Sequence, residues 1–186
     1  PAISVRDIQV KDDSTCMCSD LVAGTHGRGF WILDDVTPLR QMAQLRAAQA
    51  ANTGYLFKPA PALRVRFAPP EPPPRPPEVP AGENPPPGAL LDYYVPSNAG
   101  AVKLEILDGA NHVMRSYSSD NQVVRGTDPA MDPAKYNTLC QQNPSLPDCG
   151  LPLYWAAPQM LISTQPGVHR FNWDMRFDPI SDEGGR

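Results

Sequence analysis

The chain has 186 residues, 41% of them apolar, which suffices for one sizeable domain or two small ones with a buried core. Its formal net charge is −4 and its basic residues are scattered singly, so we expect no nucleic-acid partner. No apolar run approaches the roughly 20 residues of a membrane-spanning helix and no charged-then-apolar leader opens the chain, so we expect no membrane span.

Three segments near the start of the chain have strand-like sequences: residues 4–10, 20–25 and 29–33. A polar turn at 11–14 separates the first two segments, and a glycine-rich turn separates the second from the third. The sequence therefore predicts an antiparallel meander of three strands. Because residues 29–33 are apolar without a break, we expect the third strand to be buried on both faces.

One amphipathic helix is predicted directly after the meander. Thr37 can cap its free amides, and Pro38 at the first helical position gives up no hydrogen bond. Apolar residues then recur on one face, at Leu39, Met42 and Leu45. We expect the helix to lie against the meander and to end at residues 52–54, where Gly54 can adopt the left-handed cap.

Residues 59–88 contain thirteen of the 24 prolines, a density that favours an extended, polyproline-like linker or strap. A role as a proline-motif ligand is the alternative. Strand patterns return after the linker, at 90–95, 102–107, 113–117, 159–164 and 168–176. Residues 102–107 and 113–117 flank the turn residues 108–111 and predict a hairpin.

This second half predicts a small antiparallel sandwich. Residues 126–158 are rich in Pro, Asp and Asn and are expected to form a long loop. The acidic residues on the predicted strands, Asp92, Glu105, Asp108 and Asp174, are expected to face solvent.

Two of the four cysteines, Cys140 and Cys149, bracket a turn-rich segment that a crosslink would order, so the sequence favours a disulfide there. The other two, Cys16 and Cys18, are too close together to bond without strain and are expected to be free or paired elsewhere. Without a second Cys/His pair at a regular spacing, they are a weak zinc signal.

The segment from Asp20 to Asp35 reads DLVAGTHGRGFWILDD, and TPLRQ follows at 37–41. This segment resembles the final blade of bacterial β-propeller proteins with neuraminidase-type repeats, which are described as glycosyl hydrolases and are related to the sortilin-type propeller. In that family a proline-rich stretch leads to a β-sandwich, similar to residues 90–107 here. The segment PGVHRFNWDMR at 166–176 also resembles the family.

The resemblance implies an all-β fold whose parent protein is extracytoplasmic, periplasmic or secreted. It divides the chain into a terminal propeller-blade-like meander plus helix at 1–58, a proline-rich linker at 59–88 and an Ig-like or jelly-roll β-sandwich, truncated, at 89–186. A single blade leaves its apolar faces uncovered. We therefore expect Phe30 and Trp31 to pack on the sandwich, on the helix or on another copy, with self-association through the exposed blade.

Four residues of this segment are candidate catalytic residues: His26, Arg28, Asp34 and Asp35. A hairpin-like return could bring imidazole, guanidinium and carboxylate together, as a general base and an oxyanion or carboxylate binder. The alternative is structural: His26 and Arg28 bond to neighbouring blades, and Asp34 and Asp35 cap the strand and the helix.

No cofactor is indicated with certainty, but calcium or another divalent ion is compatible with the sequence. A metal site would draw on His26, His112 and His169 with nearby Asp, or on the oxygen-rich loops 128–132 and 178–183. Against it, His112 falls in a turn and His169 on an apolar strand face. No serine stands in a G-x-S-x-G context, so an α/β-hydrolase mechanism is unsupported.

The function expected from these features is that of a C-terminal accessory or interaction module of a glycosyl-hydrolase-like extracytoplasmic propeller protein. One alternative is a hydrolase of a small ester, lactone or glycoside that uses His26 with Asp34 or Asp35. Another is a carbohydrate-binding module whose aromatic platform would include Trp155 or the pair Tyr93 and Tyr94.

Overall fold

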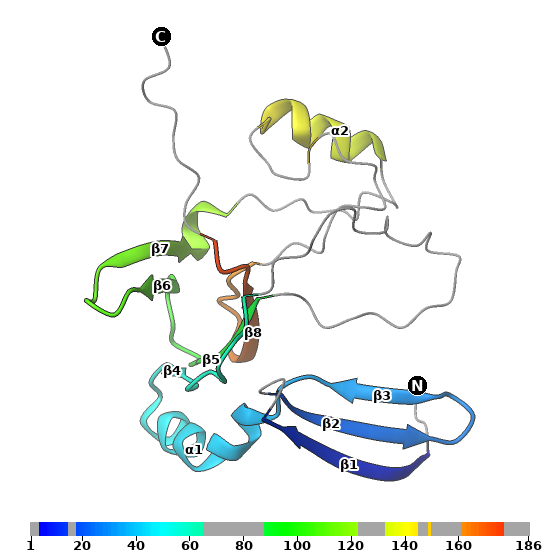
Figure 1. Ribbon diagram of the computed structural model, residues 1–186. Coiled ribbons are helices and arrows are strands. Elements are labelled where there is room, and N and C mark those ends of the chain that lie inside the picture. Colours follow the sequence, from blue (N-terminus) through cyan, green and yellow to red (C-terminus); the bar gives the residue numbers. More distant parts are fainter. Residues whose placement is uncertain are drawn as a thin grey trace. The chain divides into compact units, whose positions relative to one another are not determined.

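A computed structural model describes residues 4–14, 18–64, 88–122, 133–144, 149 and 161–176. The chain divides into two compact units, the first taking residues 1–65, 85–120 and 162–186 and the second residues 66–84 and 121–161. The described part is mainly antiparallel β-sheet with short helices (Figure 1). None of the helices in the described residues has the length and apolar character needed to cross a membrane.

The first unit begins with the predicted meander. Strands β1 (Val5–Asp13), β2 (Cys18–Thr25) and β3 (Phe30–Leu33) form an antiparallel sheet in the order β1-β2-β3 (Figure 1). β1 runs three residues further than expected. It continues because its polar end finds polar partners across the sheet: Lys11 pairs with Asp20, and Asp12 with Ser19.

The expected burial of β3 on both faces is wrong. Phe30 is 81% exposed and Trp31 57% exposed, and Ile32 and Leu33 are exposed as well. The apolar run still forms a strand because these side chains favour a pleated surface, but no sheet in the described part of the chain covers either face.

The predicted helix follows as two elements, the 3-10 helix η1 (Thr37–Gln41) and the α-helix α1 (Met42–Ala51). Of its expected apolar face, Leu45 is buried while Leu39 and Met42 are exposed. Two details of the prediction are wrong. The side chain of Thr37 makes no capping hydrogen bond, and Asn52, at φ 50°, takes the left-handed position expected for Gly54.

The second sheet of the first unit has the order β4-β5-β8 and is also antiparallel. It consists of β4 (Tyr55–Leu56), β5 (Ala89–Val95) and β8 (Gly167–Trp173). The predicted hairpin is confirmed as β6 (Lys103–Leu107) and β7 (Val113–Ser118). Residues 161–164, expected to belong to a strand, are not one.

One hydrophobic core joins the second sheet to the hairpin. Its buried members come from β5, β6, β8 and the segment before β8: Ala89, Leu91, Tyr93, Val95, Leu104, Ile162 and Phe171. Apolar residues alternate on β6 and β8, so each of these strands turns one face to this core. This core therefore packs the β6–β7 hairpin against β5 and β8.

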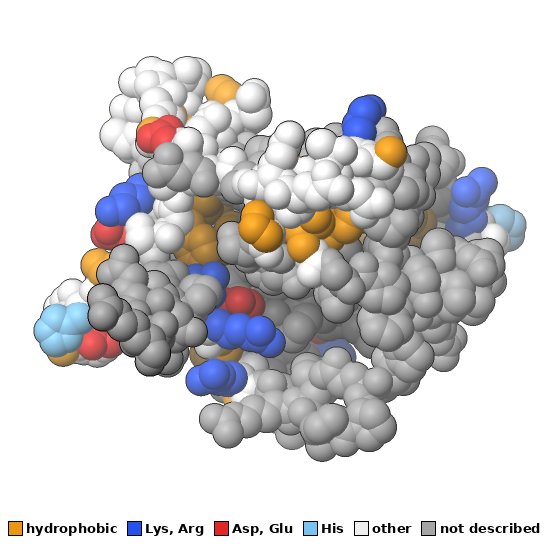
Figure 2. Space-filling model, turned by 90° about the horizontal axis from the view of Figure 1, so that it is seen from above, with side chains coloured by type: hydrophobic (Ala, Val, Ile, Leu, Met, Phe, Trp, Pro, Cys, Tyr) orange, Lys and Arg blue, Asp and Glu red, His pale blue; other side chains and the backbone are white. Residues whose placement is uncertain are grey.

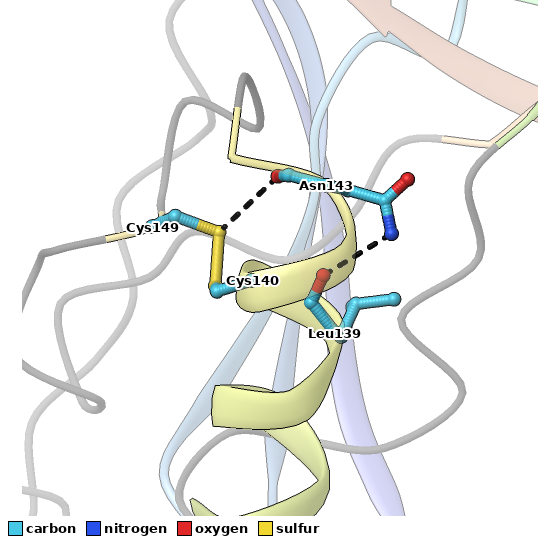
Figure 3. Close-up of a disulfide and its surroundings, with 4 residues drawn as sticks. All are labelled: Leu139, Cys140, Asn143 and Cys149. Carbon is cyan, nitrogen blue, oxygen red and sulfur yellow. Dashed lines mark hydrogen bonds between the residues drawn. A yellow bond between two sulfur atoms is a disulfide. The ribbon is translucent and has the colours of Figure 1, made fainter.

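The second unit holds an unexpected helix within the predicted loop, α2 (Pro133–Gln142). Pro133 opens it at a position where the missing N–H is not needed. The predicted disulfide between Cys140 and Cys149 is present, with a Cα–Cα distance of 5.5 Å (Figure 3). It ties the last turn of α2 to the segment that follows the helix.

Several expectations fall outside the described residues. These are the linker over 65–87, residue Cys16, the candidate calcium loops 128–132 and 178–183, and Trp155. The expected domain limits at 58 and 88 remain predictions. The backbone of Cys18 lies at the start of β2.

Candidate functional site

The four candidate catalytic residues lie at the two ends of β3. His26 and Arg28 are in the turn that precedes the strand, and Asp34 and Asp35 directly follow it. Four strand residues span roughly 13 Å at about 3.3 Å each. The structure therefore does not bring the imidazole and guanidinium together with the two carboxylates.

His26 is held at the tip of the meander by its backbone. Its N–H donates to the carbonyl of Ser4 at 3.0 Å, and its ring Nδ1 lies 3.4 Å from Nη2 of Arg6. Both side chains are exposed. Within the described residues the imidazole thus has a cation beside it rather than the carboxylate that would orient a general base.

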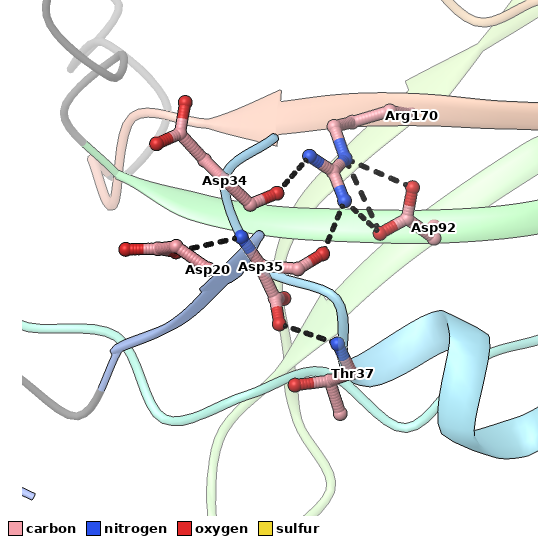
Figure 4. Close-up of polar contacts among 6 residues, drawn as sticks. All are labelled: Asp20, Asp34, Asp35, Thr37, Asp92 and Arg170. Atoms are coloured by element: carbon pink, nitrogen blue, oxygen red, sulfur yellow. Dashed lines mark hydrogen bonds and ion pairs between the residues drawn. The ribbon is translucent and has the colours of Figure 1, made fainter. Parts of the chain in front are cut away.

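Asp35 has a structural role at the junction of β3 and η1, in line with the alternative that it caps the strand and the helix. Its Oδ1 accepts the N–H of Thr37 at 2.9 Å, and its own N–H donates to Oδ1 of Asp20 at 3.0 Å (Figure 4). Its φ of 54° places it in the left-handed region, which a short polar residue tolerates better than most. Asp35 therefore shapes the bend from β3 into η1.

The backbone carbonyls of this bend contact an arginine that the sequence did not single out. Nη1 of Arg170 donates to the carbonyl of Asp34 at 2.6 Å, and Nη2 donates to that of Asp35 at 3.0 Å (Figure 4). Arg170 belongs to β8 and Asp34 follows β3. One guanidinium thus links the end of the meander to the second sheet.

The same guanidinium neutralises the buried carboxylate of Asp92 in β5. Nε donates to Oδ1 at 3.0 Å and Nη2 to Oδ2 at 3.1 Å. Asp92 is only 6% exposed, so its expected solvent-facing position is wrong. The sequence contained a signal for a buried ion pair, because an acid inside the apolar run 90–95 needs a partner. The structure supplies that partner, since Arg170 lies directly across the sheet from Asp92.

The carboxyl of Asp34 points away from the arginine (Figure 4). Burial raises the pKa of Asp34, and the nearby negative charge of Asp20 raises it further, against a smaller lowering by Arg170. A carboxyl with a raised pKa beside a second carboxylate is a pattern found in acid–base sites. Here, however, Asp20 is engaged by the N–H of Asp35, so the pair is part of the bend.

A pocket of about 420 Å³ lies elsewhere in the first unit, among β4, β5, β6 and the segment before β6. None of the four candidate catalytic residues lines it, and its wall is mainly apolar. Tyr93, one of its lining residues, accepts the N–H of Ser163 at 2.7 Å through its hydroxyl. Burial raises the pKa of Tyr93.

The aromatic pair suggested for a carbohydrate platform is not exposed. Tyr93 is 7% exposed and belongs to the core, and Tyr94 is half-buried. A sugar-binding platform needs rings that are open to solvent. The described residues therefore give no platform at this pair.

The three histidines lie in three different places. His26 is at the tip of the meander, His112 contacts Asp108 at 3.0 Å, and the ring of His169 lies 2.6 Å from the carbonyl of Gln165. Among the described residues, no group of three or more His, Cys, Asp or Glu side chains is placed to hold a metal ion.

No protein-family model matches the chain, and neither a curated protein nor a solved structure is significantly similar to it.

Proposed function

We propose that the chain is an accessory interaction module of a glycosyl-hydrolase-like extracytoplasmic propeller protein, and that it associates through the blade-like meander. The observation that carries this proposal is the apolar face of the meander, defined as Ile8, Val10, Leu21, Ala23, Trp31 and Leu33. Four of these side chains, Ile8, Val10, Trp31 and Leu33, are 46–57% exposed.

The register of the sheet assembles this apolar face. Ile8, Ala23 and Trp31 are paired across the three strands, and Val10, Leu21 and Leu33 form the next row on the same side. Two adjacent rows of three apolar residues make a continuous surface. Continuous exposed apolar patches are typical of interaction sites.

The opposite face of β3 is apolar too. Phe30 and Ile32 lie on that side, and both are more than 60% exposed. Strands that are buried on both faces have this continuous apolar sequence, as in a sheet that stacks between other sheets. This pattern supports the resemblance to a propeller blade, in which each sheet packs on its neighbours.

A second copy of the same sheet is the occupant that we propose for the apolar face. Its charges are distributed unequally along the strands. Arg6, His26 and Arg28 lie at one end with a single acid, Asp7. Asp12, Asp13 and Asp20 lie at the other end, where Arg40 pairs with Asp12 and Lys11 with Asp13, so that this end keeps an excess of acid. If two copies pack face to face about a two-fold axis, with the strands of one antiparallel to those of the other, each end of one sheet lies opposite the oppositely charged end of its partner. Such an isologous interface is self-complementary.

Two further features fit an extracytoplasmic module. The disulfide between Cys140 and Cys149 is typical of oxidising compartments. The second sheet and the β6–β7 hairpin share one core, which is the organisation that an Ig-like or jelly-roll sandwich requires. The disulfide supports the extracytoplasmic location, and the shared core supports the sandwich-like part of the proposal.

Sedimentation velocity over a range of protein concentrations tests the proposal. We expect self-association of the unmodified chain and its loss in Trp31→Glu, because a charge on the apolar face would be desolvated on association. Val113→Glu is the matched control, because Val113 is 54% exposed but lies on β7. A monomeric unmodified chain, or equal effects of both substitutions, would contradict the proposal.

A further inference from the structure

We propose that the turn between β2 and β3, residues 25–29, together with Arg6 of β1, binds an oxyanion: a carboxylate, phosphate or sulfate group of a ligand. This site lies at the tip of the meander and not on its apolar face, but it shares Arg6, His26 and Arg28 with the positive end that faces the partner in the proposed two-fold arrangement, so anion binding and self-association would compete there. It keeps the anion-binding role foreseen for Arg28 but leaves out Asp34 and Asp35, which lie at the far end of β3.

Two glycines with positive φ flank Arg28 in the turn, a pattern that anion-binding nests use. Gly27 has a φ of 76° and Gly29 a φ of 69°, while Arg28 between them is not in the positive-φ region. Alternation of left- and right-handed residues turns successive N–H groups toward one side of the chain. In the described part of the chain, no acceptor engages the N–H groups of residues 27–29.

The carbonyl of Gly29 is engaged within the turn. It accepts the N–H of Thr25 at 3.1 Å and the hydroxyl of Thr25 at 2.7 Å, and these two bonds close the turn. A Cβ atom placed on Gly27 or on Gly29 would meet nothing within 4 Å, so the space outside the turn is open. The donors can therefore be reached from solvent.

Basic side chains surround the turn. Arg6 lies against the ring of His26, and Arg28 is part of the turn itself; all three are exposed. A histidine and basic side chains project together at the right-hand edge of the space-filling view (Figure 2). Guanidinium groups bind carboxylates and phosphates through paired, charge-assisted hydrogen bonds.

Asp7, the nearest acid on β1, offsets one of the two arginine charges, so Arg6, Arg28 and Asp7 together carry a charge of +1. The carboxylate of Asp7 accepts the N–H of Ile8 at 2.9 Å and the side-chain amide of Gln9 at 3.1 Å. The tip of the meander is thus locally positive on a chain whose formal net charge is −4. A local positive potential favours an anionic ligand there.

In the turn between β6 and β7, backbone amides and a histidine ring bind a carboxylate that the chain itself supplies. There Asn111 has a φ of 65°, and the carboxylate of Asp108 accepts the N–H groups of Ala110 and His112, each at 2.8 Å. It also contacts the His112 ring at 3.0 Å. The turn at 25–29 has an imidazole and open amides but no carboxylate of its own.

A nuclear magnetic resonance titration of the whole chain tests the site. Sodium phosphate and sodium acetate are added separately at constant ionic strength, with sodium chloride as the reference. We expect saturable shifts of the amide signals of residues 27–29, and none at residues 110–112, where Asp108 already occupies the donors. The ratio of the two affinities shows whether a phosphate-type or a carboxylate-type ligand is preferred.

Variants separate a built site from general attraction of anions. Arg28→Ala and Arg6→Ala should each weaken phosphate binding at least threefold, whereas Arg46→Ala, which removes an exposed arginine of α1, should not change it. Because these side chains are exposed, we expect each variant to fold, and its spectrum checks this directly. Shifts that do not saturate, that chloride reproduces, or that persist unchanged in Arg28→Ala would overturn the proposal.

Discussion

Arg170 binds both carboxylate oxygens of Asp92 across the β5–β8 pair and, with the same guanidinium, binds two carbonyls at the end of the meander. The carboxylate is buried, while the side chain of Arg170 is 30% exposed. This arginine is therefore the principal polar link between two sheets of the first unit that the structure describes.

Arg170→Ala should lower the free energy of unfolding by about 2–4 kcal/mol, because it leaves a buried carboxylate without its counter-charge. Urea denaturation followed by fluorescence measures the change. Adding Asp92→Asn to this variant should recover part of the loss, since the amide carries no charge. A loss below about 0.5 kcal/mol in Arg170→Ala, the usual range for surface substitutions, would contradict the role given to the link.

Asp34→Asn should stabilise the protein at neutral pH. The raised pKa of Asp34 means that the folded state holds the proton more tightly than the unfolded state, so its contribution is present at acidic pH and is lost as pH rises through the folded pKa. The side-chain amide of asparagine does not ionise, so the variant does not lose stability as the pH rises. We expect a rise in Tm of the order of 1 °C at pH 7 and a smaller rise at pH 3; a lower Tm at pH 7 would refute this.

Gly88→Ala should destabilise the first unit by about 2–4 kcal/mol. Gly88 has a φ of 131°, and a Cβ there would lie 2.2 Å from the carbonyl oxygen of Trp173, at the start of the β5–β8 pairing. Gly100→Ala is the matched control, because a Cβ at Gly100 meets nothing within 4 Å. Equal Tm values for the two variants would show that the close approach is not required.

Replacing both Cys140 and Cys149 by serine should destabilise α2 by about 2–3 kcal/mol, since the crosslink closes a loop whose ends are nine residues apart. Hydrogen exchange of the amides in α2 measures this locally, and amides of β5 serve as the reference within the same sample. Protection of α2 that survives the double substitution unchanged would mean that packing alone orders the helix.

Elements that depend on residues close together in the sequence were predicted. The meander and the β6–β7 hairpin follow from short strand-like segments separated by Gly, Asp and Asn turns, and both are present. The helix was expected to stop at residues 52–54, and α1 ends at Ala51, directly before them. Asn52 and Gly54 can both take the left-handed conformation that ends a helix.

Features that depend on distant partners were not predicted. Asp92 was placed toward solvent because its partner lies 78 residues further along the chain. The run 29–33 predicts a strand, but whether it is buried depends on what covers the sheet, which periodicity does not contain. α2 was missed because the prolines and asparagines around it outweighed the weak helical pattern between them.

The link between Asp34 and Arg170 also bears on the order in which a growing chain can fold. The two residues are 136 positions apart, whereas the strands of the meander pair through short turns. During synthesis, the meander can therefore form long before the guanidinium that anchors it has been made. In that interval the sheet lacks its guanidinium anchor, while its apolar rows are already open to contact, as they are in the folded chain.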